Sequence, residues 1–477
     1  MCGIVGVIHT TSTSQKECWV TEVAFNALLA LQHRGQDAAG IMTSHPEQPF
    51  SMHKELGFVS DVFDRETISS LQGTMALGHT RYATTGQNTL ADTQPLHISQ
   101  SVGMVHNGNL VNYHLLRREI ESNGGHLTTS NDVEVLLHLW THTLEAERGS
   151  LTKAVIKATQ TIFETVDGAY SVVGMMPKLG LFAFRDPFGI RPLVLGTDDK
   201  GNYCFASETS ALHYVGFRLL REVKAGELVT ISPIGEIAYH QVQIEKVTAP
   251  CMFEWVYFSG ADSTLEGLSV YQTRLALGRG LAPAIRSLIR NNIVSVGVVA
   301  PIPDTARPAA IALSEELSIP YREIFLKNQY QRSFILPHQQ DRERAVQLKV
   351  SPIFSEIEGK DILLVDDSIV RGTTIQTIVR TLKECGANRI SVAVACPPIQ
   401  HSCHYGIDLP DASTLLSVQK TADQIAQWLE VDAVVFLEVE DLRRALGHRN
   451  ICRGCLDGQY PTPLCGKTEF TQHRVAK

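Results

Sequence analysis

The stretch DILLVDDSIVRGTT, residues 361–374, decides the fold of the second half of the chain. Its apolar residues predict a buried strand that two carboxylates end, and a loop with glycine and threonine leads into the helical pattern IQTIVRTLKECG. From Ile293 onward, the apolar runs IVSVGVVA, ISVAVA and AVVFLEV alternate with helical stretches. Such alternation indicates an α/β domain whose parallel sheet is buried on both faces.

The loop after this strand has the chemistry of a phosphate site. Ligands of α/β sheets bind at the carboxyl ends of the strands. Gly372 lets backbone N–H groups approach a ligand, and the N-terminus of the following helix favours an anion. Asp366 and Asp367 suit ribose hydroxyls or Mg²⁺. A bare pair of aspartates also ends strands in many doubly wound proteins, so this prediction depends on the whole pattern. Three hydroxyl donors stand in the same loop: Ser368, Thr373 and Thr374.

The first half of the chain has a different pattern of apolar and polar residues. Short apolar runs such as MALGHTRYATTG, VGMVHNGNLVN and AYSVVGMM are broken by polar residues, which predicts many strands joined by turns. Helical spacing of apolar residues predicts helices over residues 20–31 and 132–144, with Asn131 in the N-cap region of the second. This pattern of apolar and polar residues changes after Ile244, so we divide the chain into two domains, residues 2–245 and residues 246–477.

Composition limits the classes of function. The chain has 477 residues, enough for two large domains, and a net charge of -8 from 42 Lys and Arg against 50 Asp and Glu. This balance argues against general nucleic-acid binding. No secretory signal and no run of about 18 apolar residues occurs, so we expect a soluble cytoplasmic protein, in which the ten cysteines do not form a disulfide framework. A local cluster could hold a polyanion, or be solvated surface charge: Lys327, Arg332, Lys349 and Arg371.

Cys2 is a candidate nucleophile. Only Met1 precedes it, so we expect that removal of the methionine alone gives an N-terminal cysteine. Its α-amine, with an ordinary pKa of about 7.7–8.0, could then accept the proton of the thiol. By itself, Cys2 could equally be a small buried residue at the start of a strand.

Three further segments supply groups that suit an α-amino acid amide. Residues 78–84 contain His79 and Arg81, and a guanidinium can hold a carboxylate through two hydrogen bonds. Asn107 and Gly108 offer an amide and a backbone N–H to a developing oxyanion. Asp132 offers a carboxylate to an ammonium group.

The motifs MCGIVG, LQHRGQDAAG, GHTRYATTG, HNGNL, SNDVE, FRDPFGIRPL and SETSAL resemble class II glutamine amidotransferase domains. The resemblance covers most of residues 2–240 and implies an α+β N-terminal-nucleophile fold, an αββα sandwich. It implies that Cys2 forms a γ-glutamyl thioester and that Asn107 and Gly108 form the oxyanion hole. It also implies a set of residues that bind glutamine: His79, Arg81 and Asp132.

The 361–374 pattern resembles the phosphoribosyl pyrophosphate motif of type I phosphoribosyltransferases. The resemblance implies Mg²⁺ at Thr305, Asp366 and Asp367, and a loop over residues 327–335 that closes on the substrate. This loop is one residue shorter than usual and has Gln329 in place of an arginine. The residues implied to bind phosphoribosyl pyrophosphate are Lys327, Asp366, Asp367, Ser368, Arg371, Gly372, Thr373 and Thr374.

The combination of the two domains resembles the glutamine-dependent enzymes that form 5-phosphoribosylamine, pyrophosphate and glutamate in the first committed step of purine synthesis. It implies feedback by purine nucleotides and a homotetramer or homodimer. Two alternatives stay open. One is another class II amidotransferase, which makes an amino sugar or asparagine, and the other is a non-catalytic regulator that senses phosphoribosyl pyrophosphate or nucleotides.

The cysteines divide into classes. Cys452 and Cys455 form a C-x2-C element that alone could equally bind zinc. A subgroup of the resembled family carries a structural 4Fe–4S cluster, whose ligand pattern matches Cys251, Cys403, Cys452 and Cys455. Cys396 ranks behind these four, and Cys465 has no assigned role. Three others lie in apolar settings and are predicted to be core residues: Cys18, Cys204 and Cys385.

Overall fold

The structure is a computed structural model that describes residues 1–10, 18–45, 48–83, 88–327, 350–409 and 411–472. Arg332, Lys349 and the predicted loop from 328 to 335 lie outside the described residues. Within the described part of the chain, no helix is both long enough and apolar enough to cross a membrane.

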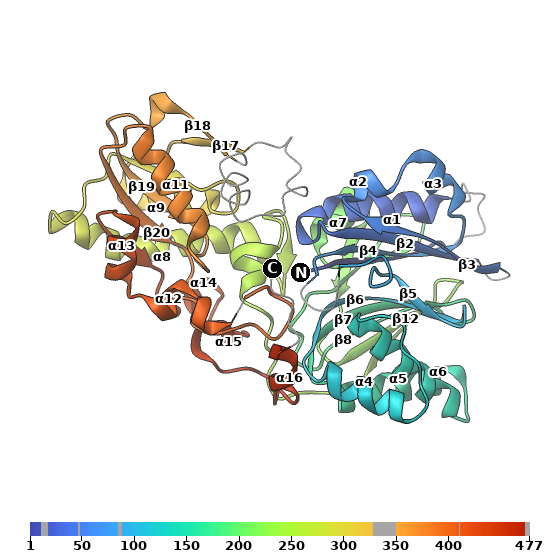
Figure 1. The fold of residues 1–477 in the computed structure, drawn as a ribbon. Coiled ribbons are helices and arrows are strands. Elements are labelled where there is room, and N and C mark those ends of the chain that lie inside the picture. Colours follow the sequence, from blue (N-terminus) through green and yellow to red (C-terminus); the bar gives the residue numbers. More distant parts are fainter. Residues whose placement is uncertain (11–17, 46–47, 84–87, 328–349, 410, 473–477) are drawn as a thin grey trace.

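Two antiparallel sheets form the first unit of the molecule (Figure 1). The seven-stranded sheet has the order β11 (Arg218–Glu222), β9 (Val194–Thr197), β10 (Tyr203–Ala206), β1 (Gly3–Ile8), β4 (Met75–Arg81), β2 (Ala38–His45) and β3 (Gln48–Leu56). The six-stranded sheet has the order β13 (Ile237–Gln241), β12 (Glu227–Ile231), β8 (Gly180–Arg185), β7 (Gly168–Met176), β6 (Val102–Leu110) and β5 (Leu96–Ile98).

Alternation along β1 explains how the two sheets stack. Val5 and Val7 pack toward the helical layer on one side, whereas Ile4 and Ile8 pack in the core between the sheets. The sheets approach so closely that a Cβ on Gly6 would lie 2.4 Å from the side chain of Val173.

Helices cover the two outer faces and complete an αββα sandwich, which confirms the predicted fold class (Figure 1). The predicted helices are also confirmed, as α1 (Trp19–Ala30) and α5 (Asp132–Ala146), and the Asn131 side chain accepts a hydrogen bond from the Val133 N–H at 3.1 Å. The other helical elements of this unit are η1 (Gln32–Arg34), α2 (Val59–Val62), α3 (Arg65–Ser70), α4 (Tyr113–Ser122), α6 (Leu151–Thr165) and α7 (Thr209–Tyr214).

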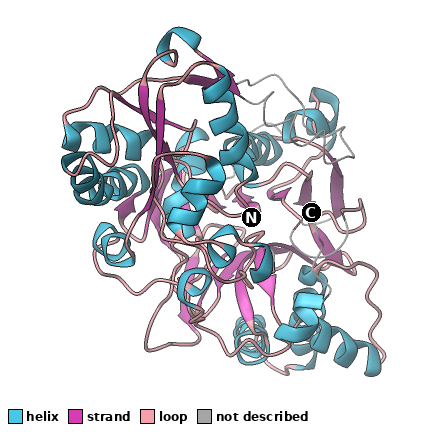
Figure 2. Ribbon diagram, turned by 60° about the vertical axis from the view of Figure 1, so that its left-hand side comes forward, coloured by secondary structure: helices cyan, strands magenta, loops and turns pink. Residues whose placement is uncertain are grey.

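The second unit contains the predicted parallel sheet, in the order β16 (Val298–Pro301), β19 (Asp361–Asp366), β20 (Arg389–Val394) and β21 (Val434–Phe436). Figure 2 shows this sheet between helices. Leu363 and Val365 pack with α8 (Val270–Arg290) and α9 (Arg307–Leu317), whereas Ile362 and Leu364 pack with α11 (Thr373–Glu384) and α13 (Ala422–Leu429). The strand is therefore apolar throughout because both of its faces are buried.

Short elements complete this unit. The strands are two hairpins, β14 (Thr264–Leu265) with β15 (Leu268–Ser269) and β17 (Phe325–Lys327) with β18 (Val350–Pro352). The helical elements are η2 (Glu254–Phe258), η4 (Phe354–Glu356), η5 (Ala412–Thr414), α12 (Leu416–Gln419), α14 (Val439–Ala445), α15 (Gly454–Asp457) and α16 (Lys467–Gln472).

The C-terminal tail returns to the first unit, where α16 lies beside α4 (Figure 1). The Arg118 guanidinium lies 2.9 Å from the Glu469 carboxylate, and the Cys465 N–H donates to the Asp167 carboxylate at 2.6 Å. The tail thus contacts both units. The division of the chain at 245 and 246 stays a prediction.

Candidate active sites and cysteine cluster

Cys2 lies at the end of the seven-stranded sheet, immediately before β1. Because Gly3 pairs with Thr80 across β1 and β4, Cys2 lies level with Arg81 on the neighbouring strand. The backbone nitrogen of Cys2 donates to Oδ1 of Asn107 at 3.2 Å, and the thiol lies 3.8 Å from the carbonyl oxygen of Tyr82. The candidate nucleophile therefore comes from one sheet, and Asn107, on β6, comes from the other.

The two predicted oxyanion donors are neighbours on β6. Oδ1 of Asn107 is used by Cys2, whereas the buried Nδ2 has no hydrogen-bond partner among the described residues. A buried donor without a partner is consistent with a ligand that binds there. Gly108 has a φ of +148°, and a Cβ there would lie 1.8 Å from the carbonyl oxygen of Ala169, so only glycine fits.

The predicted glutamine-binding residues lie on elements that meet around these donors. His79 and Arg81 are buried on β4, and burial together with the charge of Arg81 holds the pKa of His79 well below its ordinary value, so the imidazole is neutral. Asp132 begins α5, and its Oδ1 lies 3.3 Å from Nδ1 of His106. Its Oδ2 accepts a hydrogen bond from the Leu110 N–H at 3.1 Å. Both Asp132 oxygens thus face β6.

The predicted phosphoribosyl residues share one edge of the parallel sheet. Asp366 ends β19, Thr305 follows β16, and Gly372 precedes α11 with a φ of +82°. A Cβ on Gly372 would lie 2.7 Å from the Leu416 side chain, so glycine is needed for both conformation and space. At the end of β17, Nζ of Lys327 lies 2.7 Å from the Asp304 carboxylate, beside Thr305. The remaining residues of the loop stand around the start of α11: Asp367, Ser368, Arg371, Thr373 and Thr374.

The charges at this edge suit a divalent cation. Burial and the neighbouring Asp367 raise the pKa of Asp366 well above its ordinary value. Burial also raises the pKa of Asp367 to about 6, although the Ser368 hydroxyl and Arg274 oppose this shift. Two adjacent carboxylates whose ionisation is unfavourable gain stability when a cation lies beside them. The residues present therefore fit Mg²⁺, which prefers such oxygen ligands.

Comparisons with known proteins agree with the two sites. A glutamine amidotransferase domain family matches residues 79–214, and a phosphoribosyl transferase domain family matches residues 269–430. The amidophosphoribosyltransferase of Methanocaldococcus jannaschii is 39% identical over 483 residues, which cover 97% of this chain and 98% of that protein. The chain belongs to the amidophosphoribosyltransferase family.

Two solved structures extend this finding to the fold. The glutamine phosphoribosylpyrophosphate amidotransferase of Bacillus subtilis, in complex with ADP and GMP, has a TM-score of 0.85 at 33% identity and covers 98% of this chain and 100% of its own. A structure described as the allosteric regulatory enzyme of purine biosynthesis has a TM-score of 0.87 at 34% identity, with 100% and 99% covered. The predicted class, an amidophosphoribosyltransferase of purine biosynthesis, is confirmed, and amino-sugar or asparagine synthesis is not supported.

Four cysteines lie in one buried core cluster of the second unit: Cys251, Cys403, Cys452 and Cys455. Cys251 and Cys452 form a β-bridge, and the backbone N–H groups of Gln400 and His401 both donate to the Cys455 carbonyl oxygen at 2.9 Å. Burial raises the pKa of Cys455 well above its ordinary value, and the neighbouring Cys403, Cys251 and Cys452 raise it further. The four thiols are therefore close enough to influence one another.

Two kinds of metal centre, zinc and a 4Fe–4S cluster, use four cysteine ligands. Zinc needs four ligands about 2.0–2.3 Å from one ion. In the described part of the amidophosphoribosyltransferase, no three His, Cys, Asp or Glu side chains are grouped closely enough for a single metal ion. Four buried, neighbouring cysteines are a donor set that zinc uses and that a 4Fe–4S cluster also uses.

The remaining cysteines follow the predictions with one exception. Cys204, Cys385 and Cys396 are buried. Cys18 is not a core residue, because it precedes α1 at the surface, partly exposed, with its thiol 3.6 Å from the Glu22 carboxylate. Trp19 and Val20 after it are apolar, but Lys16 and Glu17 before it are charged. Cys465 is exposed.

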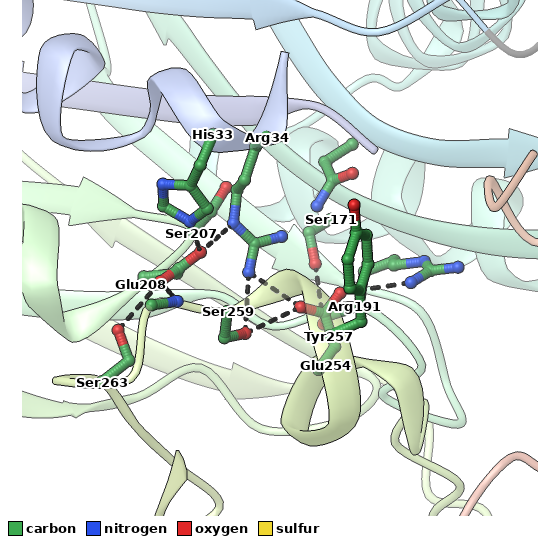
Figure 3. A network of polar contacts seen from close by, with 12 residues as sticks. His33, Arg34, Ser171, Arg191, Ser207, Glu208, Glu254, Tyr257, Ser259 and Ser263 are labelled. Carbon is green, nitrogen blue, oxygen red and sulfur yellow. Dashed lines mark hydrogen bonds and ion pairs between the residues drawn. The ribbon is translucent and has the colours of Figure 1, made fainter. Parts of the chain in front are cut away.

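A buried chain of ion pairs joins the two units and was missed by the sequence analysis (Figure 3). The Arg34 guanidinium binds the carboxylates of Glu208 and, at 2.7 Å, Glu254. Arg191 lies 3.2 Å from the other oxygen of Glu254. The Ser263 hydroxyl and the Gly260 N–H also donate to Glu208, at 2.9 and 2.7 Å. The motifs LQHRGQ and SETSAL contain Arg34 and Glu208, but isolated charges in a sequence do not reveal their partners.

Proposed function

We propose that this chain converts glutamine, phosphoribosyl pyrophosphate and water into 5-phosphoribosylamine, pyrophosphate and glutamate with the residues described above. The observation that carries the proposal is the contact between Cys2 and Asn107. It joins the backbone of Cys2 to a buried amide whose nitrogen has no partner among the described residues. This is the arrangement that acyl transfer through a tetrahedral intermediate requires.

The first half-reaction takes place at Cys2. The thiol gives its proton to the α-amine that is freed when Met1 is removed, and the sulfur attacks the glutamine amide carbon. Asn107 and Gly108 donate hydrogen bonds to the resulting oxyanion. Arg81 binds the glutamine carboxylate and Asp132 binds its ammonium group. His79, which is neutral, is the third residue of the glutamine-binding site. The protonated α-amine returns its proton to the amide nitrogen as the C–N bond breaks, which releases ammonia, and water then hydrolyses the γ-glutamyl thioester to glutamate.

The second half-reaction takes place at the edge of the parallel sheet. The loop from Ser368 to Thr374, with Arg371, binds the 5-phosphate at the N-terminus of α11. Asp366 and Asp367 bind the ribose hydroxyls, and Thr305 and Lys327 bind the pyrophosphate. Bound Mg²⁺, held at Thr305, Asp366 and Asp367, would neutralise charge on the leaving group. Ammonia forms a bond to C1 of the ribose as the bond to pyrophosphate breaks, and the new amine then loses a proton to water.

We also propose that Cys251, Cys403, Cys452 and Cys455 hold a 4Fe–4S cluster. Its support is that four thiols from segments far apart in the sequence are buried in one core cluster and lie near enough to influence one another. A cluster there clamps the C-terminal tail to the second unit and has no step in the reaction.

The regulation that we propose follows from the relatives. Purine nucleotides are the proposed feedback inhibitors, because the similar Bacillus subtilis enzyme was solved with ADP and GMP. A homotetramer or homodimer in the cytoplasm, with a glutaminase domain at 2–245 and a phosphoribosyltransferase domain at 246–477, completes the proposal.

The test uses protein purified without oxygen, with glutamate and pyrophosphate release followed in the same samples. We expect Cys2→Ala to abolish glutamate release, by about 10³-fold or more, and to keep the ammonia-dependent release of pyrophosphate. Cys204→Ala, at a buried cysteine of β10, is the matched control and keeps both activities. Equal loss of both activities in Cys2→Ala contradicts two separate sites. A wild-type chain that never hydrolyses glutamine favours the regulator.

A further inference from the structure

Asn107 and Gly108, which we call the oxyanion segment of β6, are held in place from only one edge of their strand by the sheet. On one edge, Asn107 and Gly108 pair with Ser171 and Tyr170 of β7. On the other edge, the pairing between β5 and β6 ends at Met104, three residues earlier. The sheet alone therefore fixes this segment from one side, although the donors of an oxyanion hole must be held to within a fraction of an ångström.

A second support comes from the other end of the chain. A Cβ on Gly406 would lie 3.3–3.4 Å from three backbone atoms of Gly108, so the backbone at Gly406 packs directly against the oxyanion glycine. Gly406 has a φ of +99°, a conformation that side chains rarely adopt. The segment from Cys403 to Ile407 thus forms a wall behind the oxyanion segment.

Arg191 fixes this wall. Its side chain is fully buried, and Nε and Nη2 both donate to the carbonyl oxygen of Tyr405, with the Nε distance at 2.8 Å. The third nitrogen, Nη1, donates to the Glu254 carboxylate at 3.2 Å. The guanidinium is therefore held rigidly, and it binds Tyr405, the residue directly before Gly406.

The backbone of Arg191 reaches the other oxyanion residue. Its carbonyl oxygen accepts a hydrogen bond from the Ser171 hydroxyl at 3.0 Å, and Ser171 is the cross-strand partner of Asn107. One residue thus connects to both donors. Its backbone connects to Asn107 through β7, and its side chain connects to Gly108 through the 403–407 segment.

We propose that Arg191 and Gly406 are positioning residues for the oxyanion hole of the glutaminase site. Neither touches the substrate. They keep Asn107 and Gly108 at the distance at which the tetrahedral intermediate, but not the ground-state amide, is bound best. The inference rests on the proposed function, because it assumes that Asn107 and Gly108 serve the thioester chemistry of Cys2.

The variants for the test are Gly406→Ala, whose added Cβ presses on the Gly108 backbone, and Arg191→Lys, which keeps the charge but cannot form the paired bonds to Tyr405. For both, we expect the kcat of glutamine hydrolysis to fall about 10–100-fold, with the KM for glutamine within about two-fold. The ammonia-dependent release of pyrophosphate stays unchanged. If Arg191→Lys does not fold, Gly406→Ala alone decides the test.

A second readout separates positioning from general damage. The γ-aldehyde of glutamine forms a tetrahedral adduct with the Cys2 thiol, so its affinity should fall by the same factor as kcat/KM. Alkylation of Cys2 by iodoacetamide creates no oxyanion and should keep its wild-type rate. The control is Gly201→Ala, where φ is +82° and a Cβ meets nothing within 4 Å, so it tests backbone strain without a contact.

Three outcomes overturn the inference. The first is an unchanged kcat in the folded variants, and the second is an unchanged affinity for the aldehyde. The third is a loss of iodoacetamide reactivity or of the ammonia-dependent rate that matches the loss of glutaminase activity, since this shows that the variants damage the protein generally. If the wild-type protein releases no glutamate from glutamine, the proposed function itself fails, and the variants play no part in that result.

Discussion

The oxygen and the nitrogen of the Asn107 side-chain amide have different roles. Oδ1 accepts a hydrogen bond from the Cys2 nitrogen, which fixes the orientation of the amide and leaves Nδ2 as the donor beside the thiol. A carboxamide is the side chain that can offer an acceptor on one end and a donor on the other. At the residue scale, this contact connects the proposed nucleophile of one sheet to the proposed oxyanion donor of the other.

The first prediction concerns this residue. Asn107→Ala should lower the kcat of glutamine hydrolysis by about 10²–10³-fold, because one oxyanion donor is lost. Asn107→Asp keeps the acceptor toward Cys2 but replaces the donor with a charge that repels the oxyanion, so its loss should be at least as large. Steady-state glutamate release measures both, with ammonia-dependent pyrophosphate release as the control. Full activity in Asn107→Asp would remove Nδ2 from the mechanism.

At the scale of a single element, the start of α11 depends on Gly372. Its left-handed backbone turns the loop into the helix, and the space that a Cβ would take is filled by Leu416 of α12 and Trp428 of α13. The backbone N–H groups of the first helical turn thereby stay open toward the proposed 5-phosphate.

Gly372→Ala should raise the KM for phosphoribosyl pyrophosphate about ten-fold or more, because the phosphate loop must move. The ammonia-dependent reaction measures this effect without the glutaminase site. Gly359→Ala is the matched control, since Gly359 also has a positive φ, of +67°, but no atom within 4 Å of a Cβ. An equal change in KM in both variants would assign the effect to backbone strain in general.

At the scale of the whole molecule, buried ion pairs join the two units. Burial raises the pKa of Glu208, but the charges of Arg34 and His33 outweigh burial and hold it far below its ordinary value of 4.5. A depressed pKa means that this carboxylate stabilises the folded state above about pH 4.5, and that the contribution is lost as the pH falls below that value.

Glu208→Gln should therefore lower the free energy of unfolding at pH 7 by about 3–5 kcal/mol, because Arg34 loses a buried partner. The difference in unfolding free energy from the wild type should narrow as the pH falls below 4.5, because Glu208 of the unfolded wild-type chain then binds a proton while the folded carboxylate stays ionised. Denaturant unfolding at a series of pH values measures this. A difference that stays constant or widens in acid would show that Glu208 contributes through packing and not through its charge.

The second prediction at this scale concerns metal content. Cys455→Ala should lose the iron and sulfide, about four of each per chain, that we expect in the wild type purified without oxygen. Cys204→Ala, at a cysteine that is equally buried but lies in the seven-stranded sheet, should keep both. Elemental analysis gives the iron, and zinc measured in the same samples tests the alternative metal. Zinc at one atom per chain without sulfide would contradict the cluster.

The sequence alone predicted which side chains form the candidate sites and how the sheets and helices are layered. Apolar periodicity predicted the strands and helices, because it reports which faces are buried, and short motifs such as residues 361–374 placed carboxylates, glycine and hydroxyls on one loop. Motif resemblance placed Cys2, Asn107 and Asp132 in one predicted site, and the structure brings them to adjoining elements. The prediction that Cys18 is a core residue was wrong because only the residues after it, Trp19 and Val20, are apolar, whereas the charged Lys16 and Glu17 precede it.

Only the tertiary structure decided how the two units are connected. The packing of Gly406 on Gly108, the bonds of Arg191 to Tyr405, and the pairing of Arg34 with Glu208 and Glu254 all join residues that are far apart in the chain. No local pattern predicts such partners, because a buried charge or a glycine in contact has the same sequence neighbours as one in solvent. Their energies come from desolvation and close packing, which exist only after the sheets and helices have assembled.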